Sequence, residues 1–449
     1  MKDCIFWGKN KLFRSDAFNI YKDSLGFDKL SVKDLDLISK RKRQKVLTLV
    51  LSKSKFYQEF YKGIKIKDSF FLDDAFWEDL PILEKQHVRE YAKDIFCCNP
   101  GSKDVKKVTT GGSTGDPLTS YRDRRFYDEV LQWRMLKRWN VSPAENRLML
   151  WRDTGEYSGM RARLFNQLLW FPTLRIRGDV SVLTEDVMIN LFYESNRVAV
   201  KIIWGYVGAV FQYANFLLEK NLSYNKSLDC VWVTAAPLSR NQRFIIEKAF
   251  GTEVLNQYGC SEVHFIASGV RNNHNLVVEK DYRHLDLVQT DGAIILEEEH
   301  GIMGDVLVTD LGNSVFPLIK YRVGDRTSYA KERYGDLRGL PMIEPVKGRV
   351  TDDLRMGNGR IISGEYLTTV FDNYVGIVRS FQFIQIDRYS IKIRIVSNSE
   401  SIENVMLKVV EDLQRIAGND VDFEWKLVDQ IVHDRGKTRY IISRLDDQN

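Results

Sequence analysis

Apolar positions in the first part of the chain recur at three- and four-residue spacing. Between residues 37 and 63, Leu47 and Leu51 are followed at this spacing by four aromatic side chains, which predicts a core-facing helix. The basic run KRKRQK, residues 40–45, lies at the polar start of this pattern, and we interpret it as a solvated face rather than a basic interaction patch. A second helical pattern covers residues 127–139.

The middle of the chain alternates between apolar, β-branched runs and helical patterns. RVAVKIIWG, residues 197–205, and CVWVTAAPL, residues 230–238, are each followed by a segment with helical periodicity. This alternation is typical of an α/β sheet with crossover helices. Ligands of such sheets bind beyond the carboxyl ends of the strands. TAAPL and NQYGCSE lie where a strand pattern gives way to a loop, so both segments are candidates for a binding site.

The C-terminal part follows a different pattern. SFQFIQI and SIKIRIVS alternate as strands do, the next segment predicts a helix from a cap at Ser401 to a stop at Gly418, and FEWKLV alternates again. Together they predict a small ββαβ-like module. We place the boundary near Gly348, which gives an N-terminal domain of residues 1–347 and a C-terminal domain of residues 348–449. No internal repeat or low-complexity segment interrupts this organisation.

Charge and composition restrict the function classes only moderately. The chain of 449 residues is long enough for two or three domains, and its 66 Lys and Arg against 61 Asp and Glu leave a net charge of +5. This small excess does not argue for a nucleic-acid or membrane partner, and it would tolerate an anionic substrate. No basic stripe interleaved with aromatic residues is present, which further disfavours nucleic-acid binding.

The five cysteines, Cys4, Cys97, Cys98, Cys230 and Cys260, are odd in number and show no CxxC spacing. This pattern disfavours a disulfide framework or a structural zinc site and favours a reducing compartment. The first residues lack the apolar run of a signal peptide, and the most apolar windows are too short to cross a bilayer. We therefore expect a cytoplasmic protein that does not insert into membranes.

The stretch VTTGGSTGDPLTSY, residues 108–121, is too rich in glycine and hydroxyl side chains for a helix or a strand interior. Closely spaced glycines let backbone N–H groups converge on phosphate oxygens. Two known phosphate loops are excluded, because Asp116 stands where GxxxxGK[ST] requires glycine and because adjacent Gly111 and Gly112 break GxGxxG. From composition alone, a phosphate loop and a plain solvent loop remain equally good interpretations.

Five motifs together resolve this choice. TGGSTGDP, residues 110–117, resembles the phosphate-binding loop of the adenylate-forming superfamily, which includes acyl-CoA synthetases, adenylation domains and luciferases. QYGCSE, YRVGD, GRVTDD and DRGKTRYIISR resemble the further motifs of that superfamily and follow in the same order. KSKFYQEFYKG and LPILEKQHVREY look like segments of phenylacetate–CoA ligases, and GGSTGDPL with GNGRIISGEYLTTVF looks closest to their CapK-like relatives. The resemblance covers nearly the whole chain.

This resemblance implies an α/β fold, with a large N-terminal adenylate-forming domain of mixed sheets and helices and a small mobile α+β C-terminal domain. It also implies an ATP site in which Glu262 holds Mg²⁺ and Ser261 donates to the α-phosphate. Asp325 suits the two ribose hydroxyls, because an ionised carboxylate only accepts hydrogen bonds. The nucleotide-binding residues that it implies are Thr110, Gly111, Gly112, Ser113, Thr114, Gly115, Ala236, Pro237, Gln257, Tyr258, Gly259, Asp325 and Arg349.

The implied catalytic residues are Lys437, Glu262 and Ser261. Lys437 would bridge the substrate carboxylate and the α-phosphate with a compact charge. The family rotates the C-terminal domain between two half-reactions, about a hinge that would here be Asp352. Taken singly, plainer interpretations hold: Glu262 as a helix-start acid, Asp325 as a turn residue and Lys437 as a solvated tail lysine. Taken jointly, the residues favour an adenylating site.

Two positions depart from the family pattern. Asp116 stands where many relatives have Lys, which removes a positive charge beside the departing pyrophosphate. Ala236 stands where phenylacetate–CoA ligases usually have Glu. Neither carries the chemistry in the family's mechanism, so activity is not excluded, but the choice of substrate is left open.

The acyl pocket is expected between WRDTGEYSGMR, IIWGYVGAVFQY and AAPL. Trp204, Tyr206 and Phe211 suit an apolar wall, whereas Arg152 and Arg161 suit an anionic head group, and the sequence does not choose between them. The histidines show no metal-ligand spacing and are interpreted as structural, with His264 an exception because it follows the acidic motif. Cys260 has no visible base partner and is interpreted as a small filler.

The expected function is therefore an ATP- and Mg²⁺-dependent ligase that makes an acyl-adenylate from a small carboxylic acid and passes the acyl group to coenzyme A. An amide or ester synthetase, with an amine or hydroxyl acceptor such as an amino sugar, is the alternative. A non-catalytic nucleotide-binding module is disfavoured by the joint presence of Glu262, Asp325, Arg349 and Lys437. The sequence leaves open the acid, the acceptor, and whether the protein is a monomer or a homodimer.

Overall fold

The computed structural model describes residues 1–64, 73–109, 118–126, 128–151, 168, 170–180, 183–346, 354–362, 364–371, 374, 377–431 and 440–445. The chain divides into two compact units. Unit 1 comprises Met1 and residues 3–143 and 257–345, and unit 2 comprises Lys2 and residues 144–256 and 346–449.

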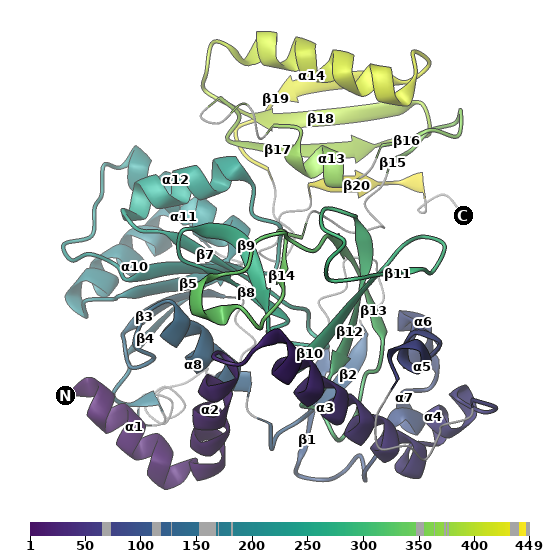
Figure 1. Cartoon of the computed structure of the whole chain (residues 1–449). Coiled ribbons are helices and arrows are strands. Elements are labelled where there is room, and N and C mark those ends of the chain that lie inside the picture. The colour runs from purple at the N-terminus through teal and green to yellow at the C-terminus, as the bar shows by residue number, and fades with distance from the viewer. Residues whose placement is uncertain are drawn as a thin grey trace. The chain divides into compact units, whose positions relative to one another are not determined.

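The helices of unit 1 precede most of its strands in the sequence (Figure 1). They are α1 (Lys2–Phe13), α2 (Ser15–Phe27), α3 (Val32–Lys53), α4 (Lys55–Phe60), α5 (Asp74–Glu78), α6 (Lys85–Glu90), α7 (Ala92–Ile95) and α8 (Asp128–Arg138). The helix predicted over residues 37–63 is in fact two helices. Ser54 separates them because its backbone is extended, and its side chain accepts a hydrogen bond from the Tyr57 N–H at the start of α4.

The basic run within α3 corrects the sequence interpretation. Arg43 is only 5% exposed and lies 4.7 Å from the centre of the Trp77 ring. Lys42 donates to the Asp281 carbonyl over 2.7 Å and lies 3.8 Å from the Tyr282 ring centre. The prediction of a solvated face is therefore wrong for these two side chains, because aromatic rings lie against their charged groups and oxygen atoms of Asp281 and Asp74 accept from them.

Three sets of strands build the rest of unit 1. The antiparallel pair β1 (Val105–Thr109) and β2 (Thr119–Asp123) flanks the Gly-rich segment. A four-stranded antiparallel sheet has the order β11-β10-β12-β13, formed by β11 (Ile294–Ile295), β10 (Arg283–Val288), β12 (Gly304–Asp310) and β13 (Tyr321–Thr327). The third set is the antiparallel run β14-β9-β8-β7, formed by β14 (Met342–Ile343), β9 (Asn273–Val278), β8 (Ala267–Val270) and β7 (Val254–Tyr258).

The first half of unit 2 is the predicted α/β arrangement. Its strands are parallel in the order β6-β5-β3-β4, with β6 (Cys230–Thr234), β5 (Ile202–Tyr206), β3 (Arg147–Trp151) and β4 (Arg175–Asp179). Three helices follow strands in the chain: α10 (Glu185–Arg197), α11 (Val207–Glu219) and α12 (Arg240–Phe250). Leu148, Ile203 and Val231 of the strands share one buried apolar cluster with these helices, so the helices cover that face of the sheet (Figure 1).

The second half of unit 2 confirms the predicted ββαβ order. β17 (Ser380–Gln385), β18 (Ser390–Val396), α14 (Ile402–Ala417) and β19 (Asp422–Leu427) follow one another, and β20 (Ile441–Ser443) completes a sheet of order β19-β18-β17-β20. β15 (Leu354–Arg355), β16 (Ile361–Ile362) and α13 (Gly364–Thr369) precede them. α14 packs its apolar side chains against β18 in one buried cluster (Figure 1). The mixed α/β class is confirmed, whereas the domain boundary near Gly348 stays a prediction because residues 347–353 lie outside the described residues.

Candidate functional site

The loop that follows β7 carries the QYGCSE motif and turns sharply. The Cys260 N–H donates to the Val263 carbonyl over 2.9 Å, and the Val263 N–H donates to the Cys260 sulfur over 3.3 Å. A Cβ on Gly259 would lie 2.9 Å from the Phe265 nitrogen, closer than real side chains allow, so the turn requires glycine at this position. Gln257 is buried and donates to the Tyr258 carbonyl over 2.9 Å.

The carboxylate of Glu262 is positioned by β13. Glu262 is 4% exposed, and its Oε1 accepts a hydrogen bond from the Tyr321 hydroxyl over 2.9 Å. No helix begins at Glu262, so its interpretation as an ordinary helix-start acid is wrong. Tyr321 is the first residue of the YRVGD motif and was not singled out from the sequence.

A second hydrogen bond joins the same two segments. The Tyr258 hydroxyl donates to Oδ2 of Asp325 over 3.0 Å. Asp325 lies within β13, where the pairing with β12 is irregular and Gly324 has a φ of +89°, so Asp325 is a strand residue rather than a turn residue. The structure thus brings together Tyr258, Glu262 and Asp325, which are three of the predicted site residues.

Backbone strain marks the loops around these residues. Phe265, three residues after Glu262, has a φ of +52°, and Lys320, immediately before Tyr321, has a φ of +48°. In unit 2, Ala235 of the TAAPL segment has a φ of +73°. Non-glycine residues rarely adopt this left-handed conformation, and it concentrates at functional sites.

A charged cluster that sequence reasoning missed lies against the acidic motif. Arg122 of β2 donates through Nη1 to Oδ2 of Asp128 over 3.0 Å and lies 2.6 Å from Nδ1 of His264. Its Nη2 donates to the Ser261 carbonyl. Arg283 approaches the other carboxylate oxygen of Asp128 at 3.3 Å. His264, followed by the two guanidinium groups, holds the pKa of Asp128 well below its usual range, against the effect of burial.

The donor set at Glu262 is compatible with a magnesium ion that substrate phosphates would hold for the most part. Among the described residues, no group of three or more His, Cys, Asp or Glu side chains is arranged to hold a metal. Mg²⁺ usually binds one or two carboxylates together with substrate phosphates, keeping several waters, and does not need an all-protein cage. Glu262, whose Oε1 is fixed by Tyr321, suits such a single carboxylate ligand.

Unit 2 holds the aromatic residues predicted for the acyl pocket. Trp204 stacks on Trp232 with ring centres 4.3 Å apart, and Tyr206 lies 4.4 Å from Trp151. Phe211 belongs to the buried apolar cluster formed with the helices, and Tyr206 packs against the same cluster. Ala236 and Pro237 follow β6 and are half-buried.

Several predicted residues lie outside the described part of the chain. They are the Gly-rich residues Thr110, Gly111, Gly112, Ser113, Thr114 and Gly115, the pocket candidates Arg152 and Arg161, and Arg349, Asp352 and Lys437. Their roles, together with the roles of Ser261 and the other described site residues, stay predictions.

Cys260 and the histidines are placed as follows. Burial and the neighbouring Glu262 raise the pKa of the Cys260 thiol well above its usual value, which suits a filler and not a nucleophile. His87 accepts a hydrogen bond from the Glu84 N–H at the start of α6, and His284 lies 3.1 Å from Asp286, so both have structural contacts. His264, the exception in the sequence analysis, lies in the cluster beside the acidic motif.

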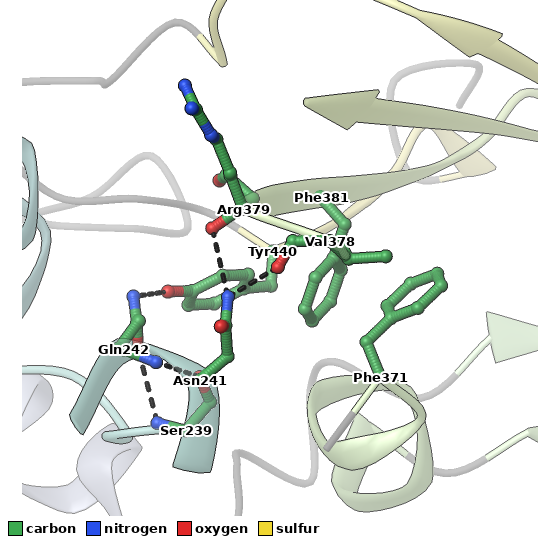
Figure 2. Close-up of a pocket in the computed structure, with 9 residues that line it drawn as sticks. Ser239, Asn241, Gln242, Phe371, Val378, Arg379, Phe381 and Tyr440 are labelled. Atoms are coloured by element: carbon green, nitrogen blue, oxygen red, sulfur yellow. Dashed lines mark hydrogen bonds between the residues drawn. The ribbon is translucent and has the colours of Figure 1, made fainter. Parts of the chain in front are cut away.

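A small pocket in unit 2 lies between the start of α12 and the C-terminal module (Figure 2). The Asn241 side chain donates to the Val378 carbonyl, and the Gln242 side chain donates to the Tyr440 hydroxyl. Arg379 pairs with Glu219 over 3.0 Å. Tyr440 is the first described residue after residues 432–439, which include Lys437.

Comparison with solved structures shows the class of fold. A 2-hydroxyisobutyryl-CoA ligase, solved in the postadenylation state with 2-HIB-AMP, matches with a TM-score of 0.72 over 90% of this chain and 89% of its own, at 15% identity. An o-succinylbenzoate CoA synthetase from Bacillus subtilis matches with a TM-score of 0.51 over 75% of this chain and 67% of its own, at 14% identity. The chain therefore has the fold of the adenylate-forming superfamily.

Sequence comparison narrows the relationship. Residues 354–444 match the family model of the CapK C-terminal domain. The protein CapK of Staphylococcus aureus is 22% identical over 92% of this chain and 90% of its own length. The chain is thus a CapK homologue with an adenylate-forming fold, which confirms the resemblance predicted from the motifs. No helix among the described residues is both long and apolar enough to cross a membrane.

Proposed function

We propose that this protein activates a carboxylic acid with ATP and Mg²⁺, releases pyrophosphate and transfers the acyl group to the thiol of coenzyme A. The observation that carries the proposal is the meeting of two separate motifs within unit 1. The hydrogen bonds of Tyr321 to Glu262 and of Tyr258 to Asp325 join the loop after β7 to β13. This meeting is what an ATP site built from those motifs requires. The ligand of the similar 2-hydroxyisobutyryl-CoA ligase, 2-HIB-AMP, supports an acyl-adenylate product.

In the first half-reaction, both reacting groups are anionic: the carboxylate of the acid and the α-phosphate of ATP. A carboxylate oxygen attacks the α-phosphorus, an O–P bond forms, and the bond from that phosphorus to the bridging oxygen breaks as pyrophosphate leaves. The site has to offset both negative charges and hold the reacting atoms in line. Glu262 would hold Mg²⁺ against the phosphates, Asp325 would accept from the ribose hydroxyls, and Lys437 would bridge the two reacting anions.

The second half-reaction needs little from Lys437. The thiol sulfur attacks the acyl carbon, the C–S bond forms, AMP leaves with the electron pair of the C–O bond, and the thiol proton passes to solvent. Trp204 and Tyr206 remain the candidates for an apolar wall beside the acyl group, whereas Phe211 is better explained by its core cluster.

A second candidate function follows from the similarity to CapK across 92% of the chain. In it, the same acyl-adenylate would pass to an amine or a hydroxyl, for example of an amino sugar in surface polysaccharide or secondary-metabolite biosynthesis. Both candidates share the adenylation step and differ only in the acceptor. Product analysis with coenzyme A, carrier-protein thiols and amino sugars offered in parallel separates them.

The adenylation step is tested by acid-dependent exchange of pyrophosphate into ATP across a panel of carboxylic acids. We expect Glu262→Gln to lose exchange by at least about 100-fold and to remain folded, because a neutral amide is a poor ligand for a hard cation. Glu298→Gln, at an exposed position, is the matched control and should behave as wild type. Unchanged exchange in Glu262→Gln would remove Glu262 from the site. Nucleotide binding without exchange for any acid would favour a non-catalytic module.

A further inference from the structure

We propose that Arg122 is a positioning residue for the loop after β7 that carries Glu262, called here the acidic loop. Arg122 would fix this loop for metal binding and link it to β2, the strand that follows the Gly-rich segment. The inference rests on the proposed function, because it assigns Arg122 a part in placing Glu262. Arg122 lies on β2, which begins at Thr119, directly after residues 110–117. Its side chain reaches a loop that is 139 residues away in the sequence.

The Arg122 side chain contacts the acidic loop at the backbone of the loop. Arg122 Nη2 donates to the carbonyl oxygen of Ser261. The peptide unit is planar, so fixing this carbonyl also fixes the plane that contains the N–H and the Cα of Glu262. The far end of the same turn is held in a similar way, because Arg283 Nε donates to the His264 carbonyl over 2.8 Å. Two guanidinium groups therefore hold the carbonyls on both sides of Glu262 and Val263.

Asp128 couples these two arginines. Its Oδ2 accepts from Arg122 over 3.0 Å, and its Oδ1 lies 3.3 Å from Arg283 Nη2. Arg283 also donates to Asp310 over 2.6 Å, so two carboxylates balance two guanidinium charges. The Arg122 side chain is 11% exposed, and at this burial an unbalanced charge would be costly. The arrangement holds Arg122 in one position.

His264 completes the cluster. Its Nδ1 lies 2.6 Å from Arg122 Nη1 and 3.3 Å from Oδ2 of Asp128, so the ring contacts both the arginine and the carboxylate. Arg122 thus meets a carbonyl, a carboxylate and an imidazole at once. The planar fork of arginine supplies donors in fixed directions, which the single ammonium group of lysine cannot reproduce.

The glutamate side chain has its own support in Tyr321, so the position of Glu262 is determined twice: at its backbone by Arg122 and at its Oε1 by Tyr321. Groups that orient a metal ligand from behind typically contribute about 10- to 100-fold to metal affinity or activity. Arg122 contacts the Ser261 carbonyl, Asp128 and His264, so it would act on the metal through the loop. Its effect should therefore appear in the response to Mg²⁺.

The test measures the affinity for a non-hydrolysable ATP analogue by calorimetry, with Mg²⁺ and with EDTA, in the full-length chain. Wild type should bind more tightly with Mg²⁺, and Arg122→Met should lose this gain by about 10-fold or more. Arg122→Lys should keep part of it. Arg124→Met is the matched control, since Arg124 is an exposed arginine two residues further along the chain, and it should match wild type. Thermal unfolding reports whether each variant folds.

A double-mutant cycle with Glu262→Gln separates a positioning role from a general loss of structure. If Arg122 acts through Glu262, Arg122→Met adds little to the loss of Mg²⁺-dependent affinity already caused by Glu262→Gln. Additive losses, or a Mg²⁺ response in Arg122→Met equal to that of wild type, would overturn the inference. A wild-type Mg²⁺ response without acid-dependent pyrophosphate exchange would overturn the proposed function alone.

Discussion

The Tyr321 hydroxyl donates to Oε1 of Glu262 over 2.9 Å, and this hydrogen bond joins two motifs that lie 59 residues apart. Both side chains are buried, at 0% and 4% exposure. Burial raises the pKa of Tyr321 far above its usual range, so the phenol stays protonated and remains a donor at any working pH. The Glu262 carboxylate is therefore oriented by a neutral hydrogen-bond donor, which does not neutralise its negative charge as a cation would.

We expect Tyr321→Phe to lower adenylation by about 10-fold, because Glu262 keeps its charge but loses its orientation. Its free energy of unfolding should fall by about 1–3 kcal/mol, the cost of leaving a buried acceptor without its donor. Tyr329→Phe is the control, since that buried hydroxyl donates to the Leu285 carbonyl over 3.2 Å. It should lose stability but not activity. Pyrophosphate exchange and urea unfolding measure the two effects, and wild-type exchange in Tyr321→Phe would refute the role of Tyr321.

Lys437 is expected to act in adenylation and not in acyl transfer. Lys437→Ala should slow acyl-adenylate formation by at least about 100-fold, because a positioned charge acting on a developing anion contributes several kcal/mol. Transfer from a chemically supplied acyl-adenylate should stay near the wild-type rate. Single-turnover assays of each half-reaction decide the matter. Adenylation at the wild-type rate would mean that Lys437 is a solvated lysine after all.

The hydroxyl of Tyr440 offers a milder test of the same region. Tyr440 lies three residues after Lys437 in the sequence. Within unit 2, its hydroxyl accepts a hydrogen bond from the Gln242 side chain (Figure 2). Tyr440→Phe removes the acceptor but keeps the ring contact with Phe381, which has a centre distance of 5.1 Å. We expect adenylation to fall by about 5- to 10-fold, since one hydrogen bond contributes about 1 kcal/mol. Tyr389→Phe, at an exposed position, should match wild type. Equal rates in both variants would show that this contact does not serve the reaction.

Lys42 predicts a specific dependence of stability on pH. Burial lowers its pKa to about 8, well below the value near 10.4 of an unfolded chain. Between these values the unfolded chain binds more protons than the folded chain, so Lys42 makes stability rise with pH from about 8 toward 10. Lys42→Met should flatten this part of the profile, and the exposed control Lys45→Met should not. Urea unfolding at pH 7.5, 9 and 10 measures the slope, and identical slopes in wild type and Lys42→Met would contradict the burial of the charge.

The sequence predicted those features that depend on local pattern. Alternation over residues 390–396 and the helix from Ser401 to Gly418 specify β18 and α14, because periodicity records which side of each of these elements is buried. β17, an inner strand, is buried on both faces. The motif segments after β6 and β7 fall at strand ends, as the strand patterns indicated. These features need no knowledge of distant partners.

The sequence could not predict features that depend on distant partners. The pairing of Arg122 with the Ser261 carbonyl joins residues 139 positions apart, and nothing in the pattern around Arg122 distinguishes it from its exposed neighbours Arg124 and Arg125. The solvated-face interpretation was wrong for Lys42 and Arg43 for the same reason. The rings of Trp77 and Tyr282 that cover Arg43 and Lys42 come from distant segments. Local charge patterning does not report such contacts.

The proposed reaction cleaves ATP between the α- and β-phosphates and activates a carboxylic acid as its adenylate. The most direct measurement is product analysis of a single turnover with γ- and α-labelled ATP, Mg²⁺ and an acid selected from the exchange panel, quenched in acid and resolved by mass spectrometry. The account predicts acyl-AMP and pyrophosphate in equal amounts, both dependent on the acid and both absent in Glu262→Gln. Formation of ADP and phosphate, or turnover that does not depend on any carboxylic acid, would contradict it.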